Sequence, residues 1–176
     1  MKLIMIGYRG CGKTSVGKRV AEAQGMQYLD VDDVTCDRIG CDSIAKIWED
    51  HGEPYWRANE VAVTEDLCKQ DNLVIGLGGG TLMQDGARKA VETATDTLRV
   101  YLKGSAKLLY QRITGDVRSS ETRPSLTAMG GGLDEVIHML EKREPTYLAV
   151  ADVVIEIDGM DLDQVTAAVM NVCRLA

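Results

Sequence analysis

The first 24 residues hold the feature that most restricts the fold of this chain. Residues 2–6, K-L-I-M-I, form a short apolar run that suits a buried strand. Residues 7–14, G-Y-R-G-C-G-K-T, follow the pattern G-x-x-x-x-G-K-[ST], and we expect a helix over about 13–24. Such a turn presents successive backbone N–H groups and the positive end of a helix, which together bind phosphate. The sequence therefore predicts an α/β fold that begins with a phosphate-binding loop (P-loop).

The chemistry of this loop points to a nucleoside triphosphate. Lys13 is expected to reach the β- and γ-phosphates, and Thr14 to offer its hydroxyl to Mg²⁺. The turn lacks the G-x-G-x-x-G spacing of dinucleotide-binding loops. A chance glycine-rich turn is the alternative, and the flanking strand and helix disfavour it. The motif does not name the second substrate.

The rest of the chain alternates short apolar runs with helical patterns. Further strands are predicted at 27–30, 73–77, 97–102 and 152–157. Helices are predicted from near Asp32 to Gly40, from Asp42 or Ser43 to Gly52, at about 54–70 and at about 105–114. Two more are predicted from apolar residues at helical spacing. One set is Leu133, Val136, Ile137 and Leu140, and the other is Leu162, Val165, Val169 and Val172. Five strands with helices between them predict a parallel sheet covered on both faces. We find no repeat and no linker, so we predict one domain over 1–176.

Composition excludes several classes of protein. The chain has 20 basic and 27 acidic residues, a net charge of −7, which disfavours general binding to nucleic acid. The longest uncharged stretch, Leu73–Gln84, is shorter than the ~20 residues of a membrane helix, and no signal sequence is visible. The five dispersed cysteines form no C-x-x-C pair, so we expect reduced thiols in the cytoplasm and no structural zinc.

Asp30 and Asp32 form a D-x-D element at the end of the second predicted strand. Because alternate strand residues share a face, we expect both carboxylates to face the crevice beyond the strand, with Asp33 pointing elsewhere. One could hold the metal through water, and the other could accept a proton. Helix capping at 30–33 is the alternative reading, and the P-loop favours the functional one.

Three arginines are candidate anion ligands, although each alone is weak evidence. Arg57 and Glu60 are three residues apart on one helix, so they form either a surface ion pair or a guanidinium held for a substrate carboxylate. Arg143 borders an apolar stripe and could instead snorkel to solvent; Pro145 is expected to kink or end its helix. Arg112 is either solvated or stacked on a base.

Residues 115–132 interrupt the alternation of strands and helices. This segment is polar, flanked by glycines and without a clear apolar period, and it contains Arg118 and Arg123. Long loops in compact domains are usually functional or disordered. The two arginines favour a lid over an anionic ligand.

The ordered set of motifs resembles the shikimate kinase family, within the P-loop group related to nucleoside-monophosphate kinases. The motifs are G-Y-R-G-C-G-K-T at 7–14, Y-L-D-V-D at 28–32, G-E-P-Y-W-R-A-N-E at 52–60, Gly78–Gly80, Arg123-Pro124 and K-R-E-P-T-Y at 142–147. The resemblance extends from Leu3 to about Ile157. Trp56 stands where the family usually has Phe, which agrees with a chain that contains no Phe.

This resemblance implies a three-layer P-loop kinase fold, a five-stranded parallel sheet flanked by helices, with a substrate-binding helical region at about 31–60 and a mobile lid at about 115–132. It implies transfer of phosphate from ATP, with Mg²⁺, to the 3-hydroxyl of shikimate, a step of aromatic amino-acid biosynthesis. A cytoplasmic monomer is expected, with neither nucleic acid nor membrane as partner. The alternatives are a related kinase of gluconate or a nucleoside monophosphate, or a nucleotide-binding paralogue without catalysis.

The resemblance also assigns roles to residues. The implied ATP-binding residues are Gly10, Cys11, Gly12, Lys13, Thr14, Ser15, Arg112 and Arg123. The implied substrate-binding residues are Asp32, Arg57, Glu60, Gly78, Gly79, Gly80 and Arg143. Lys13, Asp32 and Arg123 are the implied catalytic residues, and Thr14 and Asp30 the implied metal ligands. Whether Arg118 or Arg123 meets the γ-phosphate stays open, as do the adenine contacts after the last strand, where Asp158–Asp161 lacks the family's basic stretch.

Overall fold

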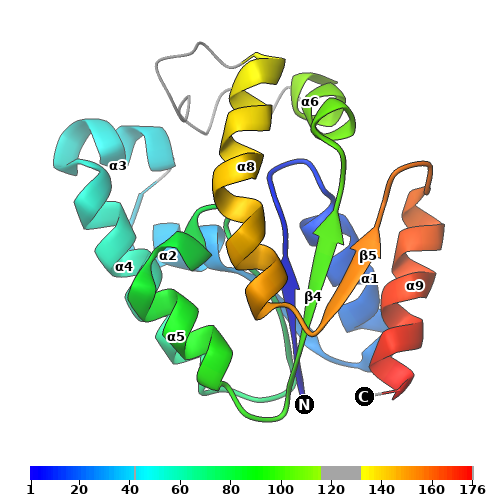
Figure 1. Cartoon of the computed structure of the whole chain (residues 1–176). Coiled ribbons are helices and arrows are strands. Elements are labelled where there is room, and N and C mark those ends of the chain that lie inside the picture. The colour runs from blue at the N-terminus through cyan, green and yellow to red at the C-terminus, as the bar shows by residue number, and fades with distance from the viewer. Residues whose placement is uncertain (42, 116–131, 176) are drawn as a thin grey trace.

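The computed structural model describes residues 1–41, 43–115 and 132–175. Its sheet is entirely parallel and has the strand order β2-β3-β1-β4-β5 (Figure 1). The strands are β1 (Lys2–Ile6), β2 (Gln27–Asp30), β3 (Leu73–Gly76), β4 (Thr97–Lys103) and β5 (Val153–Glu156). The predicted five-stranded parallel sheet is therefore confirmed.

Strand β1 is the centre of the sheet and of the hydrophobic core. All five of its residues are buried, and it pairs with β3 on one side and β4 on the other, with Leu3 opposite both Val74 and Leu98. A strand covered on both faces reads as a continuous apolar run, which is how residues 2–6 were interpreted. Because the chain has no Phe, aliphatic side chains make up most of the core.

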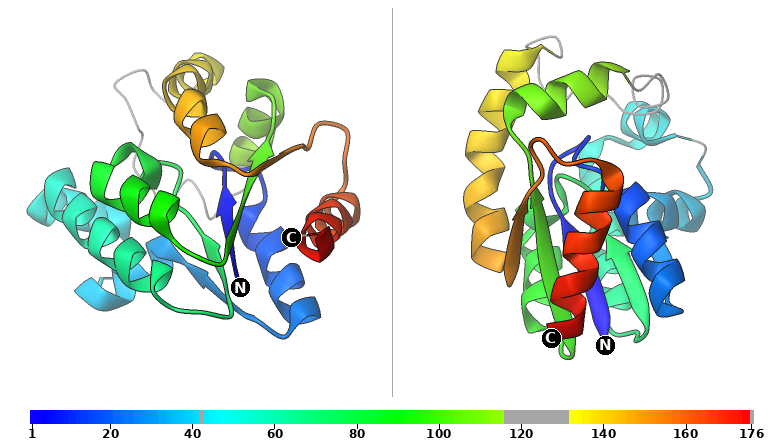
Figure 2. Two further views of the ribbon diagram at one scale, coloured as in Figure 1. Left: turned by 60° about the horizontal axis from the view of Figure 1, so that its bottom comes forward. Right: turned by 90° about the vertical axis from the view of Figure 1, so that its right-hand side faces the viewer.

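Helices cover both faces of the sheet (Figure 2). One face is covered by α1 (Lys13–Gln24) and α9 (Leu162–Leu175), which contact each other. The other is covered by α4 (Glu53–Cys68), α5 (Asp85–Thr93) and α8 (Leu133–Val150). The remaining elements are α2 (Val31–Ile39) and α3 (Ile44–His51), which pack on α4, the short turn η1 (Thr81–Met83), and α6 (Ala106–Gly115), which packs on α8.

The sequence interpretation missed one helix and left open whether Pro145 ends another. Helix α5 was not anticipated because it buries only Ala87 and Val91, too few apolar positions for a clear period. Pro145 does not end α8, which continues to Val150. Proline removes one backbone hydrogen bond there, but Tyr147 and Val150 are buried beyond it, and this packing stabilises the last turn.

Most of the predicted lid lies outside the described residues. Within 115–132, Gly115 ends α6 and Gly132 precedes α8, while Arg118 and Arg123 lie in the part that the structure does not describe.

Ser43 caps α3 by accepting a hydrogen bond from the Lys46 N–H. In the described ranges, no helix has the length and apolarity needed to span a membrane.

Candidate active site

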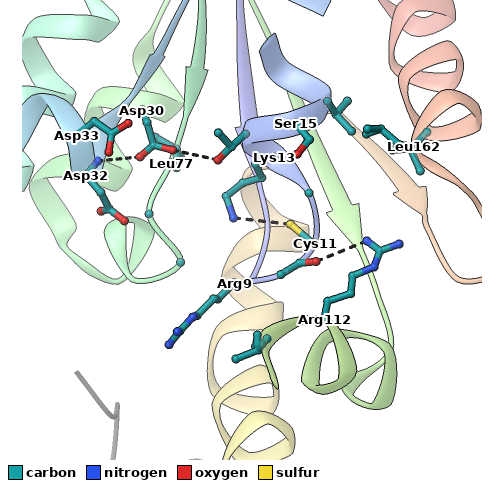
Figure 3. Close-up of a pocket in the computed structure, with 18 of the residues that line it drawn as sticks. Arg9, Cys11, Lys13, Ser15, Asp30, Asp32, Asp33, Leu77, Arg112 and Leu162 are labelled. Carbon is teal, nitrogen blue, oxygen red and sulfur yellow. Dashed lines mark hydrogen bonds between the residues drawn. The ribbon is translucent and has the colours of Figure 1, made fainter. Parts of the chain in front are cut away.

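A cavity of about 600 Å³ opens beyond the carboxyl ends of the strands (Figure 3). Five segments line it: the P-loop, the start of α2, the turn after β3, helix α6 and the start of α9. These segments follow different strands, and a parallel sheet brings the carboxyl ends of its strands to one edge. Ligands of open α/β sheets bind at this edge.

The P-loop lines the cavity with residues 9–14, and Ser15 and Val16 of α1 continue this lining. Lys13 Nζ donates to the carbonyl oxygens of Gly7 (2.7 Å) and Tyr8 (3.1 Å) and lies 3.6 Å from Cys11 Sγ, so its ammonium lies over the loop (Figure 3). Gly12, at φ 96°, adopts a left-handed conformation that glycine favours and leads directly into α1. The loop therefore has the strand-turn-helix context that its sequence predicts.

Asp30 is placed by helix capping and also faces the cavity. Its Oδ1 accepts from the Asp32 N–H (3.0 Å), and its Oδ2 accepts from the Thr14 hydroxyl (3.4 Å) and the Tyr28 hydroxyl (3.1 Å). The expectation that Asp30 and Asp32 alternate along one strand was wrong, because the chain turns into α2 at Val31. The capping interpretation and the functional one are thus compatible at Asp30.

The helical turn also changes where the neighbouring acids lie. Asp32 and Asp33 both line the cavity, although an extended chain would have pointed Asp33 away. Figure 3 shows Asp30, Asp32 and Asp33 on one side of the P-loop and Arg112 on the other. Burial, followed by the charge of Asp30, raises the pKa of Tyr28, so this phenol stays a hydrogen-bond donor to Asp30.

A smaller cleft of about 70 Å³ adjoins the large cavity. Four residues line both spaces: Arg9, Asp32, Gly78 and Gly79. The cleft is further lined by Ile44, Trp48, Trp56, Arg57, Glu60, Gly80 and Arg143. All seven implied substrate-binding residues therefore meet in this cleft, next to the P-loop.

Arg57 and Glu60 form a buried pair at this cleft, so the surface interpretation of the pair was wrong. Arg57 Nη1 donates to Glu60 Oε2 (2.8 Å), and its Nε donates to Glu53 (3.0 Å). The other Glu60 oxygen accepts from the Thr81 hydroxyl (2.6 Å), and the Glu60 side chain is only 1% exposed. Burial by itself lowers the pKa of Arg57, but the carboxylates of Glu60 and Glu53 raise it overall. The Arg57 guanidinium is thus held in place by two carboxylates and stays positively charged.

Arg143 does not snorkel to solvent. The residue is 7% exposed, and its Nη1 donates to the carbonyl oxygen of Gly79 (3.1 Å), which also accepts from the Tyr147 hydroxyl. The guanidinium carbon lies 5.7 Å from the centroid of the Tyr8 ring. The contact with Tyr8 therefore places Arg143 next to the P-loop. Its hydrogen-bond partner, Gly79, lies 64 residues away in the sequence.

Two positions of the Gly78–Gly80 turn, Gly78 and Gly80, have no room for a side chain. A Cβ at Gly78 would lie 2.6 Å from Asp32 Oδ1, and one at Gly80 would lie 2.9 Å from Arg57 Nη1. Each distance is shorter than a real van der Waals contact. Gly78 and Gly80 therefore let the backbone approach the side chains of Asp32 and Arg57.

The far end of the large cavity combines Arg112 with the start of α9. Arg112 Nη1 donates to the Gly10 carbonyl oxygen (3.5 Å), and Asp161, Leu162 and Val165 also line the cavity. The stretch after the last strand therefore reaches the cavity, through one acidic and two apolar side chains. The apolar pair suits the flat face of a base.

Sequence reasoning assigned no role to several residues that line these spaces, among them Arg9, Asp33 and Trp48. Arg9 occupies a variable position of the P-loop pattern, so the motif carries no signal for it. The direction of the Asp33 side chain depends on where α2 begins, which the sequence did not settle. Trp48 lies on α3, and an aromatic residue in a helix is usually read as core.

Comparison with known proteins identifies the family. The family model described as "Shikimate kinase" matches residues 9–174. The chain belongs to the shikimate kinase family. Two curated shikimate kinases are similar over nearly the whole chain. That of Rhodopirellula baltica is 33% identical over 96% of this chain and 88% of its own length, and that of Xanthomonas euvesicatoria is 34% identical over 99% and 91%.

The solved structures agree with this family assignment. The shikimate kinase from Acinetobacter baumannii, solved in complex with shikimate, superposes with a TM-score of 0.87 at 28% identity and covers 98% of this chain and 92% of that one. The three-layer P-loop kinase fold and the family resemblance are confirmed. Shikimate kinase chemistry is ATP-dependent phosphoryl transfer, and the family match disfavours gluconate and nucleoside-monophosphate kinases.

Proposed function

We propose that this protein is an ATP-dependent shikimate kinase that phosphorylates the 3-hydroxyl of shikimate and releases ADP. One observation carries the proposal: the large cavity at the P-loop and the smaller cleft that holds Arg57 and Arg143 share the lining residues Asp32, Gly78 and Gly79. A triphosphate in the first space and a carboxylate-bearing alcohol in the second would therefore meet at Asp32. The shared wall is what a transfer between two small substrates requires.

The larger cavity takes ATP. The backbone of Gly10 to Ser15 surrounds the phosphates, and the positive end of α1 points at them. Lys13 leaves its loop carbonyls to reach the β- and γ-phosphates. Arg112, with Leu162 opposite, borders the adenine.

The smaller cleft takes shikimate. The forks of Arg57 and Arg143 bind its carboxylate through charge-assisted hydrogen bonds. Glu60 positions Arg57, and the Gly79 backbone positions Arg143. Placing the carboxylate at this end directs the ring hydroxyls toward Asp32 and the P-loop.

Asp32 is proposed to orient the attacking hydroxyl and to take its proton. The hydroxyl oxygen bonds to the γ-phosphorus, the bond from that phosphorus to the β,γ-bridging oxygen breaks, and ADP leaves. The proton passes to the Asp32 carboxylate. Such transition states need charge neutralisation and alignment more than covalent help. Lys13 supplies positive charge on the P-loop, beside the phosphates.

The residues at the P-loop fit a Mg²⁺ ion bound with ATP. Mg²⁺ is usually held by one or two carboxylates, substrate phosphates and water. Thr14 and Asp30, whose oxygens lie 3.4 Å apart, offer the hard oxygen donors that it prefers. No group of three or more His, Cys, Asp or Glu among residues 1–41, 43–115 and 132–175 forms a metal cage, which agrees with a metal that arrives with the nucleotide. When bound, Mg²⁺ neutralises charge on the phosphates.

The test is an ADP-release assay on the full chain with shikimate, gluconate and a nucleoside monophosphate. We expect turnover with shikimate, and a loss of at least a thousandfold in Lys13→Ala. Turnover with gluconate or the monophosphate, and none with shikimate, would refute the proposal. The monomeric state, the cytoplasmic location and the absence of nucleic-acid and membrane partners stay predictions.

A further inference from the structure

Two glycines lie inside regular secondary structure, where glycine is usually unfavourable. Gly17 is in helix α1, and Gly76 is the last residue of strand β3. Gly76 pairs with Met5 of β1 on one side and with Asp30 of β2 on the other. Neither glycine has a positive φ, so the backbone conformation does not require glycine there. Glycine in a strand often marks a close approach of another group, and packing is therefore the explanation to examine.

The side chain that occupies the space beside both glycines is Tyr28 of β2. A Cβ at Gly17 would lie 2.5 Å from Tyr28 Cε2, and a Cβ at Gly76 would lie 2.3 Å from the Tyr28 hydroxyl oxygen. Real Cβ atoms essentially never come within 3.0 Å of such an atom. Gly17 thus makes room for the ring of Tyr28, and Gly76 makes room for its hydroxyl.

The Tyr28 hydroxyl is used to hold the Asp30 carboxylate. It donates a hydrogen bond to Asp30 Oδ2 (3.1 Å), and the other oxygen, Oδ1, accepts from the Asp32 N–H (3.0 Å). The carboxylate therefore cannot rotate without losing one of these two bonds. The contact from the Thr14 hydroxyl to Oδ2 is longer, at 3.4 Å, which is beyond the usual length of an O–H···O hydrogen bond. This is the contact that gives way most easily when a ligand arrives.

Tyr28 acts from behind Asp30. Asp30 and Thr14 line the large cavity, whereas Tyr28 is not among its lining residues. Lys18 Nζ lies 5.9 Å from the centroid of the Tyr28 ring. A group in this position does not touch a ligand in the cavity, but it fixes the direction of a side chain that does. Hydrogen bonds of this kind orient metal-binding carboxylates, and their loss typically weakens metal binding 10- to 100-fold.

We propose that Tyr28 is a positioning residue for the metal bound with ATP, because its hydroxyl holds the Asp30 carboxylate toward Thr14 and the cavity. This inference rests on the proposed function, in which Thr14 and Asp30 hold Mg²⁺. Gly76 is part of the same arrangement, since it supplies the space in which the hydroxyl lies. The role belongs to the hydroxyl, so a phenylalanine at position 28 would pack in the same place and lack it.

The first test measures how Mg²⁺ strengthens nucleotide binding. Calorimetry gives the affinity of the full chain for the non-hydrolysable ATP analogue adenylyl imidodiphosphate over a series of Mg²⁺ concentrations. We expect Tyr28→Phe to raise the Mg²⁺ concentration at half-maximal strengthening about tenfold. The matched control is Tyr55→Phe, which removes the hydroxyl of a tyrosine that is 44% exposed and lines neither the cavity nor the cleft. It should behave as the wild type does.

Binding without metal separates positioning from a general structural role. In the presence of EDTA, Tyr28→Phe should bind the analogue within about twofold of the wild-type affinity, because the P-loop backbone is unchanged. A variant that only loosened the fold would weaken binding with and without Mg²⁺ alike, and this result would overturn the inference. Tyr28→Phe in an Asp30→Ala background should have no further effect on the Mg²⁺ response, since the hydroxyl acts through Asp30. A further loss there would also overturn it.

The second test uses Gly76 and does not depend on Tyr28→Phe alone. Gly76→Ala places a methyl group where the hydroxyl lies, so we expect a lower melting temperature and a weaker Mg²⁺ response. Adding Tyr28→Phe removes the clashing oxygen and leaves a ring carbon 3.1 Å from the new Cβ. The double variant should recover at least half of the lost melting temperature, while its Mg²⁺ requirement stays raised. No recovery would contradict the assignment of Gly76 to the hydroxyl.

The outcomes distinguish this inference from the proposed function. If Mg²⁺ strengthens binding equally in the wild type and in Tyr28→Phe, the inference is wrong and the proposed function stands. If Mg²⁺ does not strengthen nucleotide binding in the wild type, both the proposed metal site and the inference fail. If the Mg²⁺ response follows the expected pattern but shikimate is not phosphorylated, the role of Tyr28 stands and the proposed function fails.

Discussion

Removing the Arg57 guanidinium should weaken substrate binding and lower the stability of the fold. This side chain is proposed to bind the substrate carboxylate, and it also forms an ion pair with Glu60. In Arg57→Ala the cleft loses one of its two proposed carboxylate forks. Hydrogen bonds to charged groups contribute about 1.5–3 kcal/mol. At about 1.4 kcal/mol per factor of ten, the KM for shikimate should rise about 10- to 150-fold. The KM for ATP should stay within about twofold of the wild-type value.

The stability effect follows from the burial of Glu60. Breaking a buried ion pair costs about 3–5 kcal/mol, because it leaves one charge unpaired. Arg57 is 16% exposed, and Thr81 still donates to Glu60, so we expect about 2–3 kcal/mol here. At about 2–4 °C per kcal/mol for a chain of this size, the melting temperature should fall by about 4–12 °C.

Two further variants separate these effects. Arg57→Lys keeps a positive charge near Glu60 but lacks the planar fork, so it should recover most of the melting temperature while the KM for shikimate stays raised. Arg38→Ala breaks an Arg–carboxylate bond of 3.0 Å to Asp66 between side chains that are 48% and 56% exposed; it should cost less than about 1 kcal/mol and leave both KM values unchanged. Steady-state kinetics and thermal melts measure all three variants. An Arg57→Ala protein with a wild-type KM for shikimate would refute the carboxylate role.

The remaining predictions concern Asp32, Gly80 and Asp158. Asp32→Asn should lower kcat about 10²- to 10⁴-fold with a small change in KM, and near-normal turnover would exclude it as the base. Gly80→Ala places a Cβ 2.9 Å from Arg57 Nη1 and should raise the KM for shikimate about tenfold, and an unchanged KM would contradict the close approach of this turn to Arg57. Asp158 accepts hydrogen bonds from the Ser105 hydroxyl and N–H, which lower the pKa of its carboxyl below 3.8. These bonds therefore stabilise the fold above that pH, and the contribution is lost as the pH falls through the lowered pKa. Asp158→Asn should flatten the acid side of a plot of melting temperature against pH, and an unchanged profile would contradict this.

Local sequence patterns predicted the parts of the molecule that depend on neighbouring residues. The buried run at 2–6, the turn at 7–14 and the α1 helix interact within a short stretch of chain, and the structure has all three. The Ser43 cap was predictable for the same reason. The family motifs were likewise recognised from residue types at fixed spacings.

Features that depend on distant packing escaped prediction. Arg143 could not be told from a snorkelling side chain, because its partner, Gly79, is on another element. Pro145 lies within α8 because of tertiary packing. At Asp30, strand alternation and helix capping predicted different directions for the next two carboxylates, and only the start of α2 decided between them.

The most direct measurement of the central claim is the identity of the product. The full chain is incubated with ATP, Mg²⁺ and shikimate, and the product is examined by ³¹P–¹H correlation NMR. Membership of the shikimate kinase family predicts one new phosphate monoester whose phosphorus couples to the proton on carbon 3 of shikimate, formed in equal amount with ADP. A phosphate on another hydroxyl, or ADP formed without any shikimate phosphate, would contradict the account.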